Sequence, residues 1–241
     1  MGKPLALVTG GSRGIGRAIV GRLLADGFDV LNFSRTPPDL ALSGETFESV
    51  DLMDPDACRE AISHWVAQRE IVHLVNNAGM IEVAALQDVT DEQVQKMVNL
   101  NLVAPMLLTQ ALIPAMQSSR YGRVVNIGSR AALGKVGRTV YSATKAGIVG
   151  MTRTWALELA AHGVTVNAIA PGAIATELFL AANPPESEQT KRLKAAVPLG
   201  RVGEPEEIAH MVSMLMHPLA GYTTGQVIYV CGGLSVGLAG S

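Results

Sequence analysis

The stretch Leu5-Ala-Leu-Val-Thr-Gly-Gly-Ser-Arg-Gly-Ile-Gly16 decides the fold of this chain. It begins with an aliphatic run, which predicts a short buried strand, and continues into a loop rich in glycine. Apolar residues then recur at helical spacing as far as Gly27, a residue type that commonly ends a helix. A dinucleotide site requires this order of strand, glycine loop and helix. The glycines let the backbone approach a pyrophosphate, and the helix N-terminus supplies amide donors.

The spacing of these glycines differs from the commonest dinucleotide fingerprint. It is Gly10-x-x-x-Gly14-x-Gly16, whereas the usual pattern is G-x-G-x-x-G. From the glycines alone, a plain tight turn between a strand and a helix remains an open alternative.

A second strand is expected at Phe28–Ser34, and the residues at its end indicate which dinucleotide would bind. A carboxylate at this position suits a free ribose 2′-hydroxyl, whereas a cation suits a 2′-phosphate. Here Ser34 and Arg35 end the strand without a carboxylate, and Arg13 of the glycine loop can reach the same region. The sequence therefore favours NADP, with Arg35 as an ordinary solvated residue as the alternative.

The rest of the chain alternates between predicted strands and helices. Further strands are expected near Thr46–Val50 and at Ile71–Val75, Arg123–Ile127, Val164–Ile169 and Gln226–Val230. Helices are expected from Asp54-Pro55 to about Arg69, from the Thr90 capping box through Asn101 with a kink at Pro105, around Tyr141, and from Glu204-Pro205 to about Met216. This alternation predicts an α/β fold, a doubly wound parallel seven-stranded sheet flanked by helices, in one domain spanning residues 1–241.

Composition excludes several classes of protein. The chain has 241 residues and a net charge of -2, so it has no electrostatic footprint for nucleic acid. No apolar run is expected to reach the length of a bilayer span, and no signal peptide is expected. The two cysteines and five scattered histidines show no spacing for a disulfide framework or a metal site. We expect a cytoplasmic protein with no membrane partner and no metal.

Tyr141 and Lys145 form the most chemically suggestive pair. They are four residues apart on a predicted helix, so their side chains project from one face. A fixed ammonium beside a phenol favours the phenolate and lowers the phenol pKa, which suits proton transfer to or from a carbonyl or alcohol oxygen. Taken alone, an exposed helix with an aromatic side chain and a charge remains an open alternative.

Taken together, these residues resemble the short-chain dehydrogenase/reductase family, in its compact single-domain branch, over nearly the whole chain. The matching motifs are Thr9-Gly10-x-x-x-Gly14-x-Gly16, Asp51-Leu52, Asn76-Asn-Ala-Gly79, Asn101, Ser129, Tyr141-x-x-x-Lys145, Asn167, and Pro171-Gly172 with Thr176. Each motif stands at the strand end or helix where the family places it. The resemblance implies a Rossmann fold.

The resemblance also implies four catalytic residues. Tyr141 would be the general acid/base, and Ser129 would polarise the substrate oxygen. Lys145 would hold the nicotinamide ribose and lower the pKa of Tyr141. Asn101, at the kinked helix, would hold a water in a proton relay from Lys145 to solvent.

The implied cofactor is NADP(H), with NAD(H) as the alternative. The glycine loop would carry the pyrophosphate, and the segment after the sixth strand would line the nicotinamide. The residues expected to contact the cofactor are Gly10, Ser12, Arg13, Gly14, Ile15, Gly16, Ser34, Arg35, Asp51, Leu52, Asn76, Ala78, Gly79, Tyr141, Lys145, Pro171, Gly172, Ile174 and Thr176.

Three functions follow from the resemblance. The first is an NADPH-dependent reductase of a ketone or other carbonyl to a secondary alcohol, or the reverse oxidation. The second is a 3-oxoacyl-acyl carrier protein reductase, for which Arg120 matches one carrier-docking arginine while His162 occupies the place of the other. The third is a non-catalytic nucleotide-binding scaffold, which the complete catalytic set disfavours. A homo-oligomer, either dimer or tetramer, is expected.

Two segments depart from the family pattern or leave the substrate open. Ser129 and Tyr141 are twelve residues apart, a slightly short loop that is unusually basic because of Arg130, Lys135 and Arg138. The segment at about residues 174–201 would form a substrate lid. Its polar, proline-containing centre predicts an irregular, mobile structure, with an ordered surface helix from about Glu186 to Ala196 as the alternative.

Overall fold

Seven parallel strands form one sheet in the computed structural model of the chain, which describes residues 2–184 and 186–236. The strands are β1 Leu5–Thr9, β2 Asp29–Ser34, β3 Glu45–Ser49, β4 His73–Asn76, β5 Gly122–Ile127, β6 Val164–Pro171 and β7 Val227–Val230. Their order is β3-β2-β1-β4-β5-β6-β7, which confirms the doubly wound parallel sheet. The chain reverses its direction of winding between β1 and β4, where such sheets bind ligands beyond their carboxyl ends.

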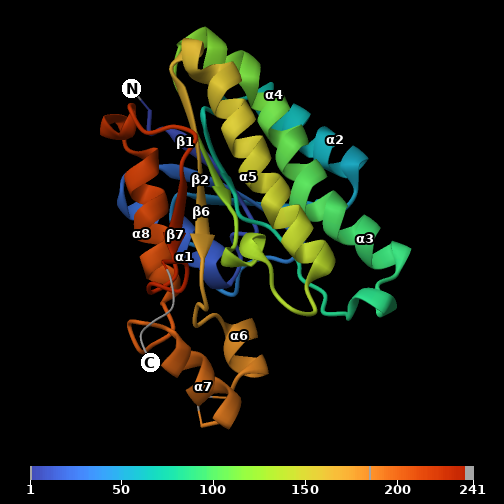
Figure 1. Ribbon diagram of the computed structural model, residues 1–241. Coiled ribbons are helices and arrows are strands. Elements are labelled where there is room, and N and C mark those ends of the chain that lie inside the picture. Colours follow the sequence, from blue (N-terminus) through green and yellow to red (C-terminus); the bar gives the residue numbers. More distant parts are fainter. Residues whose placement is uncertain (1, 185, 237–241) are drawn as a thin grey trace.

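Helices cover both faces of this sheet (Figure 1). One face carries α1 Gly14–Ala25 and α8 Pro205–Met216. The other carries α2 Pro55–Val66, α4 Ala104–Ser119 and α5 Thr139–Leu159, with α3 Asp91–Val98 leading into α4. Two short helices, α6 Glu177–Ala182 and α7 Glu188–Ala196, lie beyond one end of the sheet (Figure 1). The predicted strands and long helices are therefore present, with boundaries that differ by a turn or less.

The aliphatic run of β1 is explained by burial on both faces. Leu5 and Leu7 belong to the core under α2, α4 and α5, whereas Ala6 and Val8 belong to the core under α1 and α8. Successive side chains of a strand point to opposite faces, so a strand covered on both sides needs apolar residues at every position. β1 pairs in parallel with both β2 and β4, and it therefore lies inside the sheet.

The long helix predicted after Thr90 is interrupted by a wider turn. Thr90 Oγ1 accepts a hydrogen bond from the Gln93 amide, and Gln93 Oε1 accepts one from the Thr90 amide, which confirms the capping box. Asn99–Val103 then form a π-helical turn between α3 and α4. Proline has no amide to donate, so Pro105 leaves the carbonyl of Asn101 without its α-helical partner. The expected distortion is thus present, as a π turn just before the proline.

The prediction that no apolar segment reaches the length of a bilayer span is wrong for one helical segment. The segment Asp91–Ser119 is long and apolar enough to cross a membrane, by length and composition alone, with a mean hydropathy of 1.4 over its most apolar window. In the structure this segment supplies Leu108, Leu112 and Met116 to the core beneath the sheet. Its apolarity therefore has an explanation within the fold.

The expectation of an irregular segment at about residues 174–201 was wrong for two stretches. Thr176 Oγ1 accepts from the Phe179 amide and starts α6, and Ser187 Oγ accepts from the Thr190 amide and starts α7. Helix α7 agrees with the alternative of an ordered surface helix. Pro185, in the predicted lid, lies outside the described residues, as do residues 1 and 237–241 of the predicted domain.

Candidate active site

A cavity of about 610 Å³ lies at the carboxyl ends of the central strands. Most residues predicted to contact the cofactor line it: Gly10, Ser12, Arg13, Gly14, Ile15, Gly16, Ser34, Arg35, Asp51, Leu52, Ala78, Gly79, Tyr141 and Thr176. The structure thus brings together the glycine loop, the end of β2 and the segments that follow β3 and β4. We refer to this space as the cofactor cavity.

The glycine loop is built to receive a phosphate. Helix α1 begins at Gly14, Arg13 offers no side-chain cap, and the first turn contains no acidic residue. The amides of this turn are therefore free to donate to an anion, and the helix dipole favours one there. A Cβ on Gly16 would come within 1.9 Å of the Gly10 carbonyl oxygen, so only glycine allows this compact loop. These features fit the pyrophosphate of a dinucleotide.

A buried polar network holds the glycine loop against the neighbouring strands. Asn32 Oδ1 accepts hydrogen bonds from the Gly11 amide at 2.9 Å and from Ser34 Oγ at 2.7 Å. Asn32 Nδ2 donates to Glu45 Oε1 at 3.0 Å, and Arg17 pairs with the Glu45 carboxylate at 2.8 Å. The Glu45 side chain is 1% exposed. This network could not be predicted from the sequence, because its members come from three separate elements.

Thr9 and Asn77 join the carboxyl ends of β1 and β4. Thr9 Oγ1 accepts from the amides of Asn77 and Ala78 at 3.0 and 2.9 Å, and Asn77 Nδ2 donates to the Thr9 carbonyl at 2.9 Å. Asn77 also lines both cavities of the site, yet it was not among the predicted site residues. Its presence in the Asn76–Gly79 motif was the available signal.

Asn76 departs from the predicted cofactor set. Its side chain is buried and donates to Asn126 Oδ1 at 2.8 Å and to Thr109 Oγ1 at 3.4 Å. It lines neither cavity, because its position in β4 directs it under the helices instead. Its role in the structure is to tie β4 to β5.

A second cavity of about 420 Å³ adjoins the cofactor cavity and is referred to below as the substrate cavity. The two share Ile15, Asn77, Gly79, Tyr141, Thr176 and Leu178 in their walls. The substrate cavity also contains the remaining predicted residues other than Asn101 and Asn76: Ser129, Lys145, Pro171, Gly172 and Ile174. Tyr141 therefore stands where the two cavities meet.

Helix α5 and the end of β5 position three of the four expected catalytic side chains. Tyr141 and Lys145 lie on one face of α5, with Lys145 Nζ 5.8 Å from the centre of the Tyr141 ring. Lys145 Nζ donates to the Ile127 carbonyl at 2.8 Å. Ser129 follows β5, and its hydroxyl accepts from the Ala131 amide at 3.1 Å. The short loop between Ser129 and Tyr141 still brings them into one cavity.

The electrostatics of Tyr141 differ from the prediction. Burial raises the pKa of Tyr141, while hydrogen bonding with Ser129 and the charge of Arg138 pull that pKa partly back. The prediction that Lys145 lowers the pKa of Tyr141 is therefore wrong for this structure, because the charge that lowers this pKa is that of Arg138. Burial also lowers the pKa of Lys145 to about 8, so this amine loses its proton more readily than a solvated lysine does.

Asn101 braces the site from the π turn. Its Oδ1 accepts from the Met80 amide at 2.9 Å, and its Nδ2 donates to the Met80 carbonyl and to Thr144 Oγ1, both at 3.0 Å. A Cβ built on Gly79 would lie 3.3 Å from Asn101 Oδ1 and 3.4 Å from Lys145 Nζ, so the two residues are neighbours. Both amide hydrogens of the side chain are therefore used in these contacts.

Comparisons with known proteins agree with this site. A family profile described as "Enoyl-(Acyl carrier protein) reductase" matches residues 10–235. The chain is 40% identical over 236 residues to an acetoacetyl-CoA reductase of Shinella zoogloeoides, covering 95% of this chain and 97% of that protein. It is 36% identical over 240 residues to the 3-oxoacyl-acyl-carrier-protein reductase FabG of Vibrio harveyi, covering 95% and 96%.

A solved structure extends the comparison to the cofactor. A blue fluorescent protein from a metagenomic library, in complex with NADPH, superposes with a TM-score of 0.85 at 35% identity, covering 97% of this chain and 98% of that one. The fold and the joined cavities define a nicotinamide-dependent oxidoreductase. The chain belongs to the short-chain dehydrogenase/reductase family. The NADPH bound in that neighbour is the cofactor that Ser34 and Arg35, at the end of β2, favour in this chain.

Proposed function

We propose that this enzyme uses NADPH to reduce a ketone to a secondary alcohol, or catalyses the reverse oxidation. The observation that carries the proposal is the position of Tyr141 where the cofactor and substrate cavities meet, with Ser129 in the wall of the substrate cavity. A carbonyl placed there lies between two hydroxyl groups on one side and the nicotinamide site on the other. The oxyanion formed on reduction needs such donors.

The residues divide the chemistry among them. Bound NADPH supplies the hydride. Tyr141 donates its proton to the carbonyl oxygen, and Ser129 donates a hydrogen bond to the same oxygen. Since burial raises the pKa of Tyr141, the phenol stays protonated at neutral pH and is ready to act as an acid. This protonation state suits reduction better than oxidation.

Lys145 and Asn101 would restore the proton on Tyr141. Lys145 Nζ lies beside Gly79 at the boundary of the cavities, in reach of the ribose that the cofactor would place there. The main-chain carbonyl of Asn101, freed by Pro105, would hold a water that links the Lys145 amine to solvent. The pKa of Lys145 near 8 suits a group that passes protons at physiological pH.

A 3-oxoacyl thioester is the second candidate substrate, and the two named reductases favour it. The expected docking of a carrier protein at Arg120 has weaker support. The Arg120 guanidinium donates to the Ala161 carbonyl at 3.2 Å and so braces the end of α5, next to His162. We therefore place a small thioester ahead of a protein-bound one.

We also propose a cytoplasmic homo-oligomer. Cys58 and Cys231 are both free and buried, as expected of thiols in a reducing compartment. Met106 on α4 and Leu157 on α5 are exposed apolar side chains on neighbouring helices, with Leu157 82% exposed. A second copy that covers these helices would remove that apolar surface from water.

A substrate screen tests the proposal. NADPH absorbance would be followed with simple ketones, with 3-oxoacyl thioesters of coenzyme A, of acyl carrier protein and of N-acetylcysteamine, and with enoyl thioesters. We expect oxidation of NADPH with ketones or 3-oxoacyl compounds. NADPH binding without turnover of any compound would indicate a scaffold, and turnover of enoyl thioesters alone would indicate reduction of a carbon–carbon double bond.

A further inference from the structure

The loop between β5 and α5 places three cations in the wall of the substrate cavity. Arg130 directly follows Ser129, and Lys135 and Arg138 come later in the same loop. Arg130 and Arg138 are half-buried, and Lys135 is exposed. We call these three residues the basic rim.

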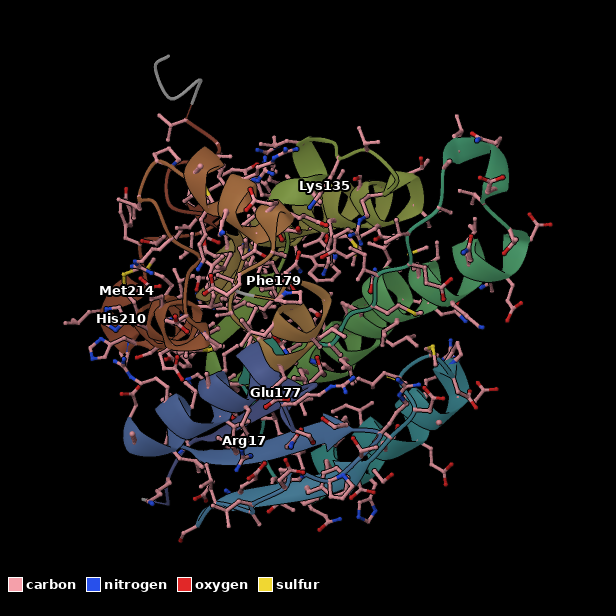
Figure 2. The ribbon with its side chains drawn as sticks, turned by 90° about the horizontal axis from the view of Figure 1, so that it is seen from below. Arg17, Lys135, Glu177, Phe179, His210 and Met214 are labelled. Carbon is pink, nitrogen blue, oxygen red and sulfur yellow. The ribbon has the colours of Figure 1, made fainter. Side chains whose placement is uncertain are left out.

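The basic rim has no counter-charge in the part of the chain that the structure describes. No aspartate or glutamate is among the described residues that line the substrate cavity. No ion pair or side-chain hydrogen bond engages Arg130, Lys135 or Arg138 within residues 2–184 and 186–236. Glu177, at the start of α6, lines the cofactor cavity instead. In the view of Figure 2, Phe179 lies between Lys135 and Glu177.

Holding these charges together has an electrostatic cost. Burial lowers the pKa of Lys135, and the charges of Arg138 and Arg130 lower it further. Like charges in one cavity wall destabilise one another unless an anion lies between them. A bound anion would remove that cost, and it would be held by charge-assisted hydrogen bonds.

The location of the rim indicates where on the ligand the anion must be. Arg138 precedes Tyr141 by three residues, and its charge reaches the phenol, since it lowers the Tyr141 pKa. Arg130 adjoins the other oxyanion donor. An anion held by both would therefore lie a few bonds from the reacting carbonyl, not at the remote end of a carrier such as coenzyme A.

We propose that the substrate is an oxo acid, whose carboxylate is bound by the basic rim while its ketone is reduced. This proposal rests on the proposed function and specifies its substrate class. The hydride adds to the carbonyl carbon, Tyr141 gives its proton to the carbonyl oxygen, and the carboxylate is unchanged. The products are the hydroxy acid and NADP⁺. Leu178 and Phe179, which also line the substrate cavity, would pack on the apolar part of the chain.

Matched acids and esters test the proposal. The probes are 2-oxo, 3-oxo and 4-oxo acids of equal chain length and their methyl esters, assayed for kcat/KM with NADPH. We expect one of the acids to exceed its ester by about tenfold to hundredfold, the range of a charge-assisted contact. Arg138→Gln should reduce that ratio to near one, and Arg138→Lys should restore part of it. Equal values for acid and ester in the unchanged enzyme would overturn the proposal.

A control variant separates the rim from general electrostatics. Arg59→Gln removes one positive charge from the exposed face of α2, outside both cavities, and should leave the ratio of acid to ester unchanged. Circular dichroism of each variant checks its fold. A drop in the ratio for Arg59→Gln as large as that for Arg138→Gln would attribute the preference to net charge and contradict a specific site.

Two further arms separate the remaining outcomes. Acetoacetyl-coenzyme A and acetoacetyl-N-acetylcysteamine differ in the carrier phosphates. A loss of kcat/KM on Arg138→Gln that is confined to the coenzyme A compound would therefore assign the anion to the carrier and overturn the proposal.

If no carbonyl is reduced, the proposed function fails, but the rim is still tested by calorimetry. 3-Hydroxybutanoate should then bind the NADP⁺ complex about tenfold or more tightly than its methyl ester, and equal binding would refute the rim.

Discussion

Tyr141 lies in the wall that the cofactor and substrate cavities share, and its burial sets the protonation state of the phenol. The Tyr-x-x-x-Lys pattern predicts a phenol whose pKa is lowered by its lysine. Burial instead raises the tyrosine pKa, and the amine of Lys145 is bound to the Ile127 carbonyl. A protonated phenol is the form that a reductase needs.

Replacing this phenol should abolish turnover. Tyr141→Phe keeps the ring in the wall between the cavities but removes the transferable proton. We expect kcat to fall by about 10²–10⁴-fold, with NADPH affinity within a few-fold of the unchanged enzyme. Steady-state rates and NADPH fluorescence titration measure the two quantities. Tyr222→Phe, at a fully exposed tyrosine, is the control, and a kcat for Tyr141→Phe close to that control would refute the assignment.

Arg35 should determine the preference for NADP. It lines the cofactor cavity beside Ser34, at the end of β2 where the 2′-phosphate is expected. Arg35→Asp removes a charge-assisted contact with the phosphate and adds a carboxylate that repels it. The preference for NADPH over NADH should therefore fall by about tenfold to hundredfold or more. The ratio of kcat/KM for the two cofactors measures this. An unchanged ratio would show that other residues, such as Arg13, recognise the phosphate.

At the level of elements, α6 and α7 form one wall of the substrate cavity. Leu178, Phe179 and Ala182 of α6 and Leu193 of α7 line it. Helix α6 has only six residues and none of them is buried, so little packing holds it in place. We propose that these helices act as a lid, since weakly packed segments of this kind open and close at active sites.

Hydrogen exchange tests the lid. We expect fast amide exchange across residues 178–184 and 186–190 in the free enzyme, because the short helices have few buried contacts. Exchange should slow when NADP and substrate are bound together. Helix α8, with Ile208 and Val212 fully buried, is the internal reference and should exchange slowly throughout. Lid amides that exchange as slowly as α8 before ligand is added would identify a fixed wall.

Elements with a buried apolar face could be predicted from the sequence, whereas α7, which has none, was given only as an alternative. β1 reads as an aliphatic run because both faces of the sheet are covered there, and α8 was placed by its Glu204-Pro205 start. Helix α7 buries only Thr190, so it leaves no apolar period to detect. Pro105 predicted a distortion of the helix, but the form of the π turn depends on the Asn101 hydrogen bonds to Met80 and Thr144.

The same distinction applies to the site. Motif residues such as Ser129 and Gly16 could be predicted because each stands at a strand end or helix start. The polar network around Glu45 and the wall contribution of Leu234 could not. These residues meet only in the folded chain, where the sheet order brings distant segments to one edge.

For the whole molecule, His73 should make stability sensitive to acid. It lies buried in β4, with Nε2 3.3 Å from the Tyr121 hydroxyl and its ring 5.0 Å from that of Phe28. Burial, with the nearby charge of Arg123, lowers the pKa of His73 to about 4. The unfolded chain binds this proton below pH 6.5, whereas the folded protein binds it only near pH 4. Stability is therefore lost as the pH falls through this window.

The loss can be isolated with a variant. Over the full window the difference amounts to about 3 kcal/mol, at 1.36 kcal/mol per pKa unit. His73→Phe removes the titration and keeps an aromatic ring against Phe28. Urea unfolding at several pH values should show a steeper loss of unfolding free energy for the unchanged protein than for the variant. Parallel curves would show that His73 does not contribute.

The pairing of α1 with α8 has a consequence during synthesis on the ribosome. The residues that line the cofactor cavity all precede position 179, so they emerge early. Helix α1, which begins at the glycine loop, shares its core with Ile208, Val212 and Leu215 of α8. Until α8 emerges, α1 alone covers that side of the sheet, and the nascent chain exposes the apolar surface that α8 will cover. The residues of the cofactor cavity thus emerge before the helix that completes the core beside them, and chains released before α8 is made would be targets for chaperones and proteases.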